Sequence, residues 1–101
     1  KFNQQSDIDL GFYKLNLNSR KIYNDENELD LTEKEADIIM FLKKSKKAVS
    51  IDVLQTEVWG HSSKLDTHTV ETHIYRLRKK MSNKFKNDNF IQSTKSGYNI
   101  K

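Results

Sequence analysis

The chain has 101 residues, of which 35% are hydrophobic and 32% charged, with a net charge of +4, three Gly and neither Pro nor Cys. This length suits one domain with a single modest core, and the scarcity of Gly and Pro argues against a disordered chain. The lack of Cys excludes disulfides and thiolate metal sites, and we find no apolar run that could cross a bilayer and no secretory leader, so we expect a cytoplasmic domain.

The N-terminal part predicts short strands. The opening residues KFNQQS are polar and aperiodic, so we expect residues 1–6 to be a linker remnant and residues 7–101 to form the domain. From residue 7 to 31 apolar and polar residues alternate in places, and turn-forming residues interrupt them at 18–20 and 25–27. Short runs of this kind predict a small antiparallel meander.

A change of hydrophobic period at Thr32 predicts the first helix. Its sequence TEKE is a capping box, because the Thr32 side chain can accept from the Glu35 N–H while the Glu35 carboxylate reaches back. Apolar residues then wrap much of the circumference, so we expect this helix to be buried on most sides. Ser50 predicts the start of a second, short helix that Gly60 stops.

The segment TVETHIYRLRKKM predicts a third helix over about 67–81. At about 100° per residue its apolar residues form one stripe about 60° wide, which must face the core. The stripe consists of Val70, Ile74, Leu77 and Met81. The opposite side carries His68, Thr72, Tyr75, Arg76 and Lys79, with Arg78 and Lys80 on its flanks. We expect this side to stay uncovered.

The basic residues gather in the same part of the chain. Residues 1–60 carry nine basic and eleven acidic residues, whereas residues 61–101 carry nine basic and three acidic ones. The third helix has one acid beyond its cap, Glu71, so it scarcely uses the ion pairs that stabilise solvated helices. Its Arg, Lys, His, Tyr and Thr side chains suit base edges and phosphates, which predicts a nucleic-acid partner. A merely solvated basic face is the alternative that remains open.

The C-terminal end predicts a β-hairpin, with FIQS and YNI as strands around TKSG, after a polar connector SNKFKNDN. Two short helices, a basic third helix and a terminal hairpin follow one another in a winged helix-turn-helix. In that fold one helix lies in the DNA major groove and the hairpin reaches the neighbouring backbone or minor groove. Lys95 at the tip would be the reaching cation.

The motifs LT..E, VWG, TVETHIYRLRKKM and a late GY, in this order and spacing, closely resemble the effector domain of OmpR/PhoB-type response regulators over roughly residues 7–101. The resemblance implies an α+β winged helix-turn-helix with an N-terminal four-stranded antiparallel sheet, three helices and a C-terminal hairpin wing. It also implies a bacterial transcription regulator of a two-component system that binds double-stranded DNA as a tandem dimer and contacts RNA polymerase. The phosphorylated receiver domain of such regulators is not part of this chain.

The resemblance assigns roles residue by residue. The base-facing residues would be Glu71, Thr72 and Arg76. The backbone contacts would be Trp59, His68, Thr69, His73, Tyr75 and Arg78, to which the outward-facing Lys79 is added. The wing contacts would be Ser93 and Lys95. The segment that touches RNA polymerase in relatives corresponds to Gly60, His61, Ser62, Ser63 and Lys64.

Three positions depart from the family pattern. Tyr75 and His68 stand where Arg is frequent, and Tyr75 would replace an ion pair with the backbone by a hydroxyl contact. The wing reads STKSGY where relatives commonly have TVRGxGY, so it is shorter, lacks the first Gly and has Lys for Arg. Because Arg suits a narrow minor groove better than Lys, backbone and minor-groove contact by the wing both remain open.

Other functions are less well supported by the sequence. His61, His68 and His73 with Glu71 suggest a metal site, but His68 and His73 lie about 140° apart on the helix, so we expect no metal, cofactor or small-molecule ligand. We find no catalytic constellation and expect no enzyme. Two alternatives are an RNA-binding module and a domain that docks an acidic protein. The first is weakened because this chain lacks an exposed aromatic strand pair that could stack on bases.

Overall fold

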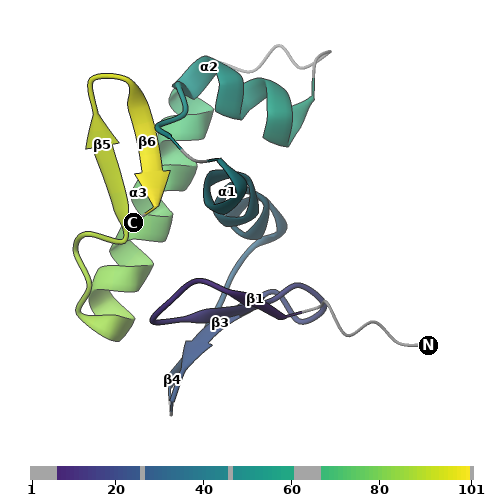
Figure 1. The fold of residues 1–101 in the computed structure, drawn as a ribbon, viewed down its shortest axis with the longest axis vertical. Helices are drawn as coiled ribbons and strands as arrows, with labels where there is room; N and C mark the ends of the chain where they lie inside the picture. Colours follow the sequence, from purple (N-terminus) through teal and green to yellow (C-terminus); the bar gives the residue numbers. More distant parts are fainter. Residues whose placement is uncertain (1–6, 26, 46, 61–66, 101) are drawn as a thin grey trace.

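The computed structural model describes residues 7–25, 27–45, 47–60 and 67–100 of the chain. The linker remnant expected over residues 1–6 lies outside this part. Figure 1 shows the N-terminal sheet at one end of the molecule, the first helix beside it, and the long last helix next to the C-terminal hairpin.

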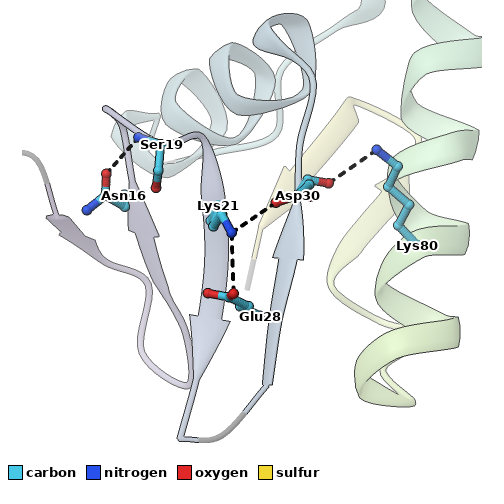
Figure 2. Close-up of polar contacts among 6 residues, drawn as sticks. All are labelled: Asn16, Ser19, Lys21, Glu28, Asp30 and Lys80. Carbon is cyan, nitrogen blue, oxygen red and sulfur yellow. Dashed lines mark hydrogen bonds and ion pairs between the residues drawn. The ribbon is translucent and has the colours of Figure 1, made fainter.

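The N-terminal strands form one antiparallel sheet in the order β1-β2-β3-β4, which confirms the predicted meander. The strands are β1 (Asp7–Asp9), β2 (Lys14–Asn16), β3 (Lys21–Asn24) and β4 (Asn27–Asp30). Leu15 and Ile22 face each other across the register and are both fully buried. The turn after β2 is held by the Asn16 carboxamide oxygen, which accepts from the Ser19 N–H at 2.9 Å (Figure 2).

An ion-pair cluster joins β3 and β4. The Lys21 ammonium lies 3.3 Å from Glu28 and 3.4 Å from Asp30 (Figure 2). The hydrogen bond to Glu28, followed by the charge of Asp30, raises the pKa of Lys21. Since all three side chains are solvated, the cluster contributes little to stability.

The first helix, α1 (Glu33–Lys44), begins with the predicted capping box. The Glu35 N–H donates to Thr32 Oγ1 at 3.2 Å, and the Thr32 N–H donates to Glu35 Oε1 at 2.9 Å. The prediction of burial on most sides is also confirmed. The buried side chains are those of Glu35, Ala36, Ile38, Ile39 and Leu42, and Met40 and Phe41 pack against them.

The second helix begins as predicted but changes its winding. Ser50 Oγ accepts from the Val53 N–H at 3.2 Å and caps α2 (Ile51–Leu54), which widens into the π-helix η1 (Gln55–Trp59). The sequence predicted one regular helix. The wider turn is supported by Lys34 of α1, whose ammonium donates to the Val58 carbonyl at 3.2 Å. Gly60, with φ +106°, ends the helix as expected.

The last helix, α3 (Thr67–Phe85), is longer than predicted, and the expected end at Met81 is wrong. Phe85 follows Met81 by one helical turn and continues the apolar stripe, and its ring packs 4.9 Å from that of Tyr13. The contact of this half-buried ring with Tyr13, just before β2, favours continuation of the helix through SNKF. The polar connector is therefore shorter than expected.

The C-terminal strands form the predicted hairpin, with β5 (Ile91–Thr94) pairing antiparallel to β6 (Gly97–Ile100). The hairpin is attached to the segment between α1 and α2 by two backbone hydrogen bonds of 2.8 Å between Val49 and Tyr98. Sheet, helices and hairpin share one core. Its fully buried members include Leu15, Ile39, Leu54, Leu77 and Ile91. The α+β winged helix-turn-helix fold is thus confirmed.

Candidate nucleic-acid interface

One long face of α3 is exposed to solvent. The stripe residues Val70, Ile74, Leu77 and Met81 are at most 2% exposed, which confirms that the stripe faces the core. The exposed side chains on the other side are those of His68, Glu71, Thr72, Tyr75, Arg76 and Lys79. All six are exposed within the described part of the chain, so this face can bind a partner.

Tyr75 and Lys79 form a contact pair on this face. The Lys79 ammonium donates to the Tyr75 hydroxyl at 3.3 Å and lies 5.6 Å from the centre of the ring. Tyr75 is 61% exposed, so the pair stands at the surface. A hydroxyl beside an ammonium can bind the oxygens of an anionic group, as the predicted backbone role requires.

His68 and Glu71 form a second pair, near the N-terminal end of α3. His68 Nδ1 lies 3.3 Å from Glu71 Oε1, and the side chains are 83% and 51% exposed. The contact places a hydrogen-bond donor beside the single acid of the helix, which lowers the repulsion that a bare carboxylate would exert on a polyanion. Glu71 therefore remains compatible with a position close to DNA.

Trp59, Thr69 and His73 lie at the edge of the exposed face and are half-buried. His73 Nδ1 lies 2.8 Å from the Thr69 carbonyl, so this nitrogen carries the proton and donates. The rings of Trp59 and His73 meet edge to face at 5.1 Å, and the Lys34 ammonium lies 5.7 Å from the Trp59 ring. These contacts attach α3 to η1 and α1.

A groove separates α3 from the wing. It consists of a hollow of about 580 Å³, lined mainly by α3 and by Tyr98, and a hollow of about 280 Å³ lined mainly by the wing. Glu71 and Tyr98 border both hollows. Arg78 lines the larger hollow, together with Ser82, Asn83 and Asp88, which the sequence reading missed. The spacing of Phe85 from Met81 indicates in the sequence that the helix continues beyond Met81, and this places Ser82 and Asn83 on α3.

The wing tip is small and exposed. Thr94 Oγ1 accepts from the Ser96 N–H at 3.1 Å and donates to the Gly97 carbonyl at 3.2 Å, which holds the turn that presents Lys95. Ser93 is exposed on β5. Of the predicted polymerase-contact segment, Gly60 is described, and His61, Ser62, Ser63 and Lys64 lie outside the described residues.

Lys80 lies on the flank of α3 where the helical wheel places it, but its side chain is only 34% exposed and is directed toward α1. Its ammonium donates to Glu35 Oε1 of α1 at 2.6 Å. It also donates to the backbone carbonyl of Asp30 at 3.4 Å, as Figure 2 shows. The Glu35 side chain is 2% exposed. A buried carboxylate attracts the nearest cation strongly, and this attraction turns Lys80 inward.

Within the described part of the chain, no group of three metal-ligating side chains comes together. None of the described helices is long and apolar enough to span a membrane.

Comparison with known proteins indicates the relationship of the chain. The family model described as "Transcriptional regulatory protein, C terminal" matches residues 26–100. The chain is 31% identical over 101 residues to the probable transcriptional regulator ycf27 of Galdieria sulphuraria, covering 96% of this chain and 40% of the relative. It is 30% identical over 98 residues to the alkaline phosphatase synthesis transcriptional regulatory protein PhoP of Bacillus subtilis, covering 95% and 41%.

Among solved structures, the fold is similar to the DNA-binding domain of E. coli CadC. The TM-score is 0.80 at 26% identity, and the match covers 98% of this chain and 94% of that one. The chain thus corresponds to a whole solved domain, but it spans about 40% of the length of the curated relatives.

Proposed function

The chain belongs to the family of C-terminal domains of transcriptional regulatory proteins, the effector domains of OmpR/PhoB-type response regulators, and on this premise we propose that it binds double-stranded DNA sequence-specifically and regulates transcription. The observation that carries the proposal is the uncovered, cation-rich face of α3 above a fully buried apolar stripe. CadC supports it, since the similar part of that protein is its DNA-binding domain.

In the proposed complex α3 lies in the major groove. Arg76 donates to guanine, the Thr72 methyl contacts thymine, and Glu71 accepts from a base amino group. Phosphates are contacted by polar side chains around these three. They are Trp59, His68, Thr69, His73, Tyr75, Arg78 and Lys79. Ser93 and Lys95 of the wing reach the adjacent backbone or minor groove across the groove described above.

The remaining partners follow from the family. We propose that Gly60 and residues 61–64 contact RNA polymerase, and that two copies bind direct repeats about one helical turn apart. Because the chain spans about 40% of its curated relatives, we further propose that a receiver domain elsewhere in the full-length protein controls it. The organism would be a bacterium, and the full-length protein an output component of a two-component system.

Selection of bound duplexes from a random pool, with wild type and Arg76→Ala, tests this function. We expect the logarithm of the wild-type binding constant to fall linearly with the logarithm of the salt concentration. The slope should be about −0.9 for each phosphate contacted. Arg76→Ala should lose base preference at one position, a difference of about 1–3 kcal/mol, and keep salt-sensitive binding. Arg78→Ala, half-buried beside the groove, is the control and should weaken all sequences alike.

The same experiment separates the alternatives. Uniform weakening by Arg76→Ala would make Arg76 a phosphate contact and remove its assignment as a base reader. Stronger competition by single-stranded RNA than by duplex DNA would favour the RNA-binding module. No sequence preference in the wild type would favour a domain that docks an acidic protein.

A further inference from the structure

Lys80 joins α3 to the junction between the sheet and α1. Its ammonium contacts Glu35 at 2.6 Å and the Asp30 carbonyl at 3.4 Å, and Figure 2 shows it reaching from α3 to the end of β4. Its own side chain is 34% exposed, whereas that of Glu35 is 2% exposed. Glu35 Oε1 also accepts from the Thr32 N–H at 2.9 Å, so the capping box of α1 holds the carboxylate in place.

The apolar stripe of α3 does not by itself fix how the helix is rotated about its axis. The stripe is about 60° wide and its hydrophobic contacts are non-directional, so a small roll of the helix about its axis loses little buried apolar area. With side-chain tips about 5–6 Å from the axis, a roll of about 20° moves them by about 2 Å. Hydrogen bonds to bases tolerate a range of about 0.5 Å. A roll of this size would therefore break base contacts.

Two side-chain contacts on one flank of α3 oppose such a roll. Lys80 lies about 90° from the centre of the stripe, and His73, about two turns earlier, lies on the same flank. His73 packs against Trp59 at 5.1 Å, and Lys80 binds Glu35. The Lys80 contact is the stronger of the two because it is charged, short and directional.

We propose that Lys80 is a positioning residue that sets the rotation of the recognition helix through Glu35, and that it does not contact DNA phosphate. This proposal rests on the proposed DNA-binding function. Its neighbour Lys79, which lies on the exposed face beside Tyr75, is the phosphate contact. Two adjacent lysines on one basic helix thus have different roles, because Lys80 reaches Glu35 whereas Lys79 contacts Tyr75 at the surface.

The test compares Lys80→Met with Lys79→Met on two duplexes, the preferred sequence and an unrelated sequence of equal length, over a range of salt concentrations. Lys79→Met should weaken both duplexes alike and lower the salt slope by about 0.9. Lys80→Met should leave the slope unchanged and lower the ratio of preferred to unrelated affinity by about tenfold, the size of one lost base contact. Lys80→Arg, which keeps the charge and the donors, should restore most of that ratio.

Glu35→Gln is the second route to the same result. The amide oxygen still accepts from the Thr32 N–H, so the capping box persists, whereas the contact to Lys80 loses the negative charge of its acceptor and is weakened. The affinity ratio should fall, although by less than in Lys80→Met, and this variant decides if Lys80→Met does not fold. The positioning role would be overturned if Lys80→Met lowered the salt dependence of binding as Lys79→Met does. It would also be overturned if Glu35→Gln left the ratio of preferred to unrelated affinity unchanged. A wild type that prefers no duplex would instead refute the proposed function.

Discussion

Gly97→Ala is expected to destabilise the domain by about 3 kcal/mol or more, a large part of the roughly 5–15 kcal/mol that holds a domain of this size together. Gly97 has φ +137°, and a Cβ atom at this position would lie 2.0 Å from the Val49 carbonyl oxygen and 2.7 Å from the Ser50 nitrogen. Both atoms belong to the backbone, so no side chain can rotate away to make room.

Two effects add at Gly97. An L-residue in this conformation costs about 1–3 kcal/mol. Relief of the clash would also separate Val49 from Tyr98 and break two hydrogen bonds of 2.8 Å, each worth about 0.5–1.5 kcal/mol. These bonds attach the hairpin to the segment before α2, so the variant should lose wing placement before the core unfolds.

Gly11→Ala is the matched control for Gly97→Ala. Gly11 also has positive φ, +94°, but no atom lies within 4 Å of the added Cβ. Urea denaturation of both variants should show only the conformational term, about 1 kcal/mol, at Gly11. Equal losses at the two positions would mean that the close approach to Val49 has no energetic role.

Glu35→Ala is expected to cost about 2–4 kcal/mol. The substitution leaves a cavity at a side chain that is 2% exposed, removes the acceptor of the Thr32 N–H and leaves the Lys80 ammonium without its carboxylate. Breaking a buried ion pair costs about 3–5 kcal/mol, and the partial exposure of Lys80, which water can reach, reduces that figure.

Glu33→Ala controls for the charge of Glu35. Glu33 is exposed in the same first turn of α1, so it has the same relation to the helix dipole. It should change the free energy of unfolding by at most about 1 kcal/mol, and high salt should abolish that change, whereas the Glu35→Ala loss should persist. Similar losses for both variants in urea denaturation would show that Glu35 acts only through the dipole.

The sequence predicted the elements that depend on local chemistry. The Thr32–Glu35 capping box, the Ser50 cap and the stop at Gly60 each involve residues at most three or four positions apart, and all three are confirmed. The stripe of α3 follows from the helical period alone, so the exposed face of Thr72, Arg76 and their neighbours followed as well.

The tertiary structure decided what depends on distant partners. The widened turn of η1 is supported by Lys34, and Phe85 at the end of α3 packs against Tyr13 from the N-terminal part of the chain. The direction of Lys80 depends on Glu35, which lies 45 positions earlier in the chain. A helical wheel places Lys80 beside other cations on an open flank, because the wheel describes an isolated helix and leaves out the elements that pack against it.

Local and tertiary features differ in the range of the interactions that specify them. Hydrogen-bond caps and apolar periodicity act within a few residues, so the order of residues is enough to specify them. A buried carboxylate draws in whichever cation the fold brings within reach, and chain order does not specify that cation. By itself the sequence determined the elements, the buried stripe and the cation-rich face. Only packing decided that Lys80 is directed toward Glu35 while Lys79 remains at the surface.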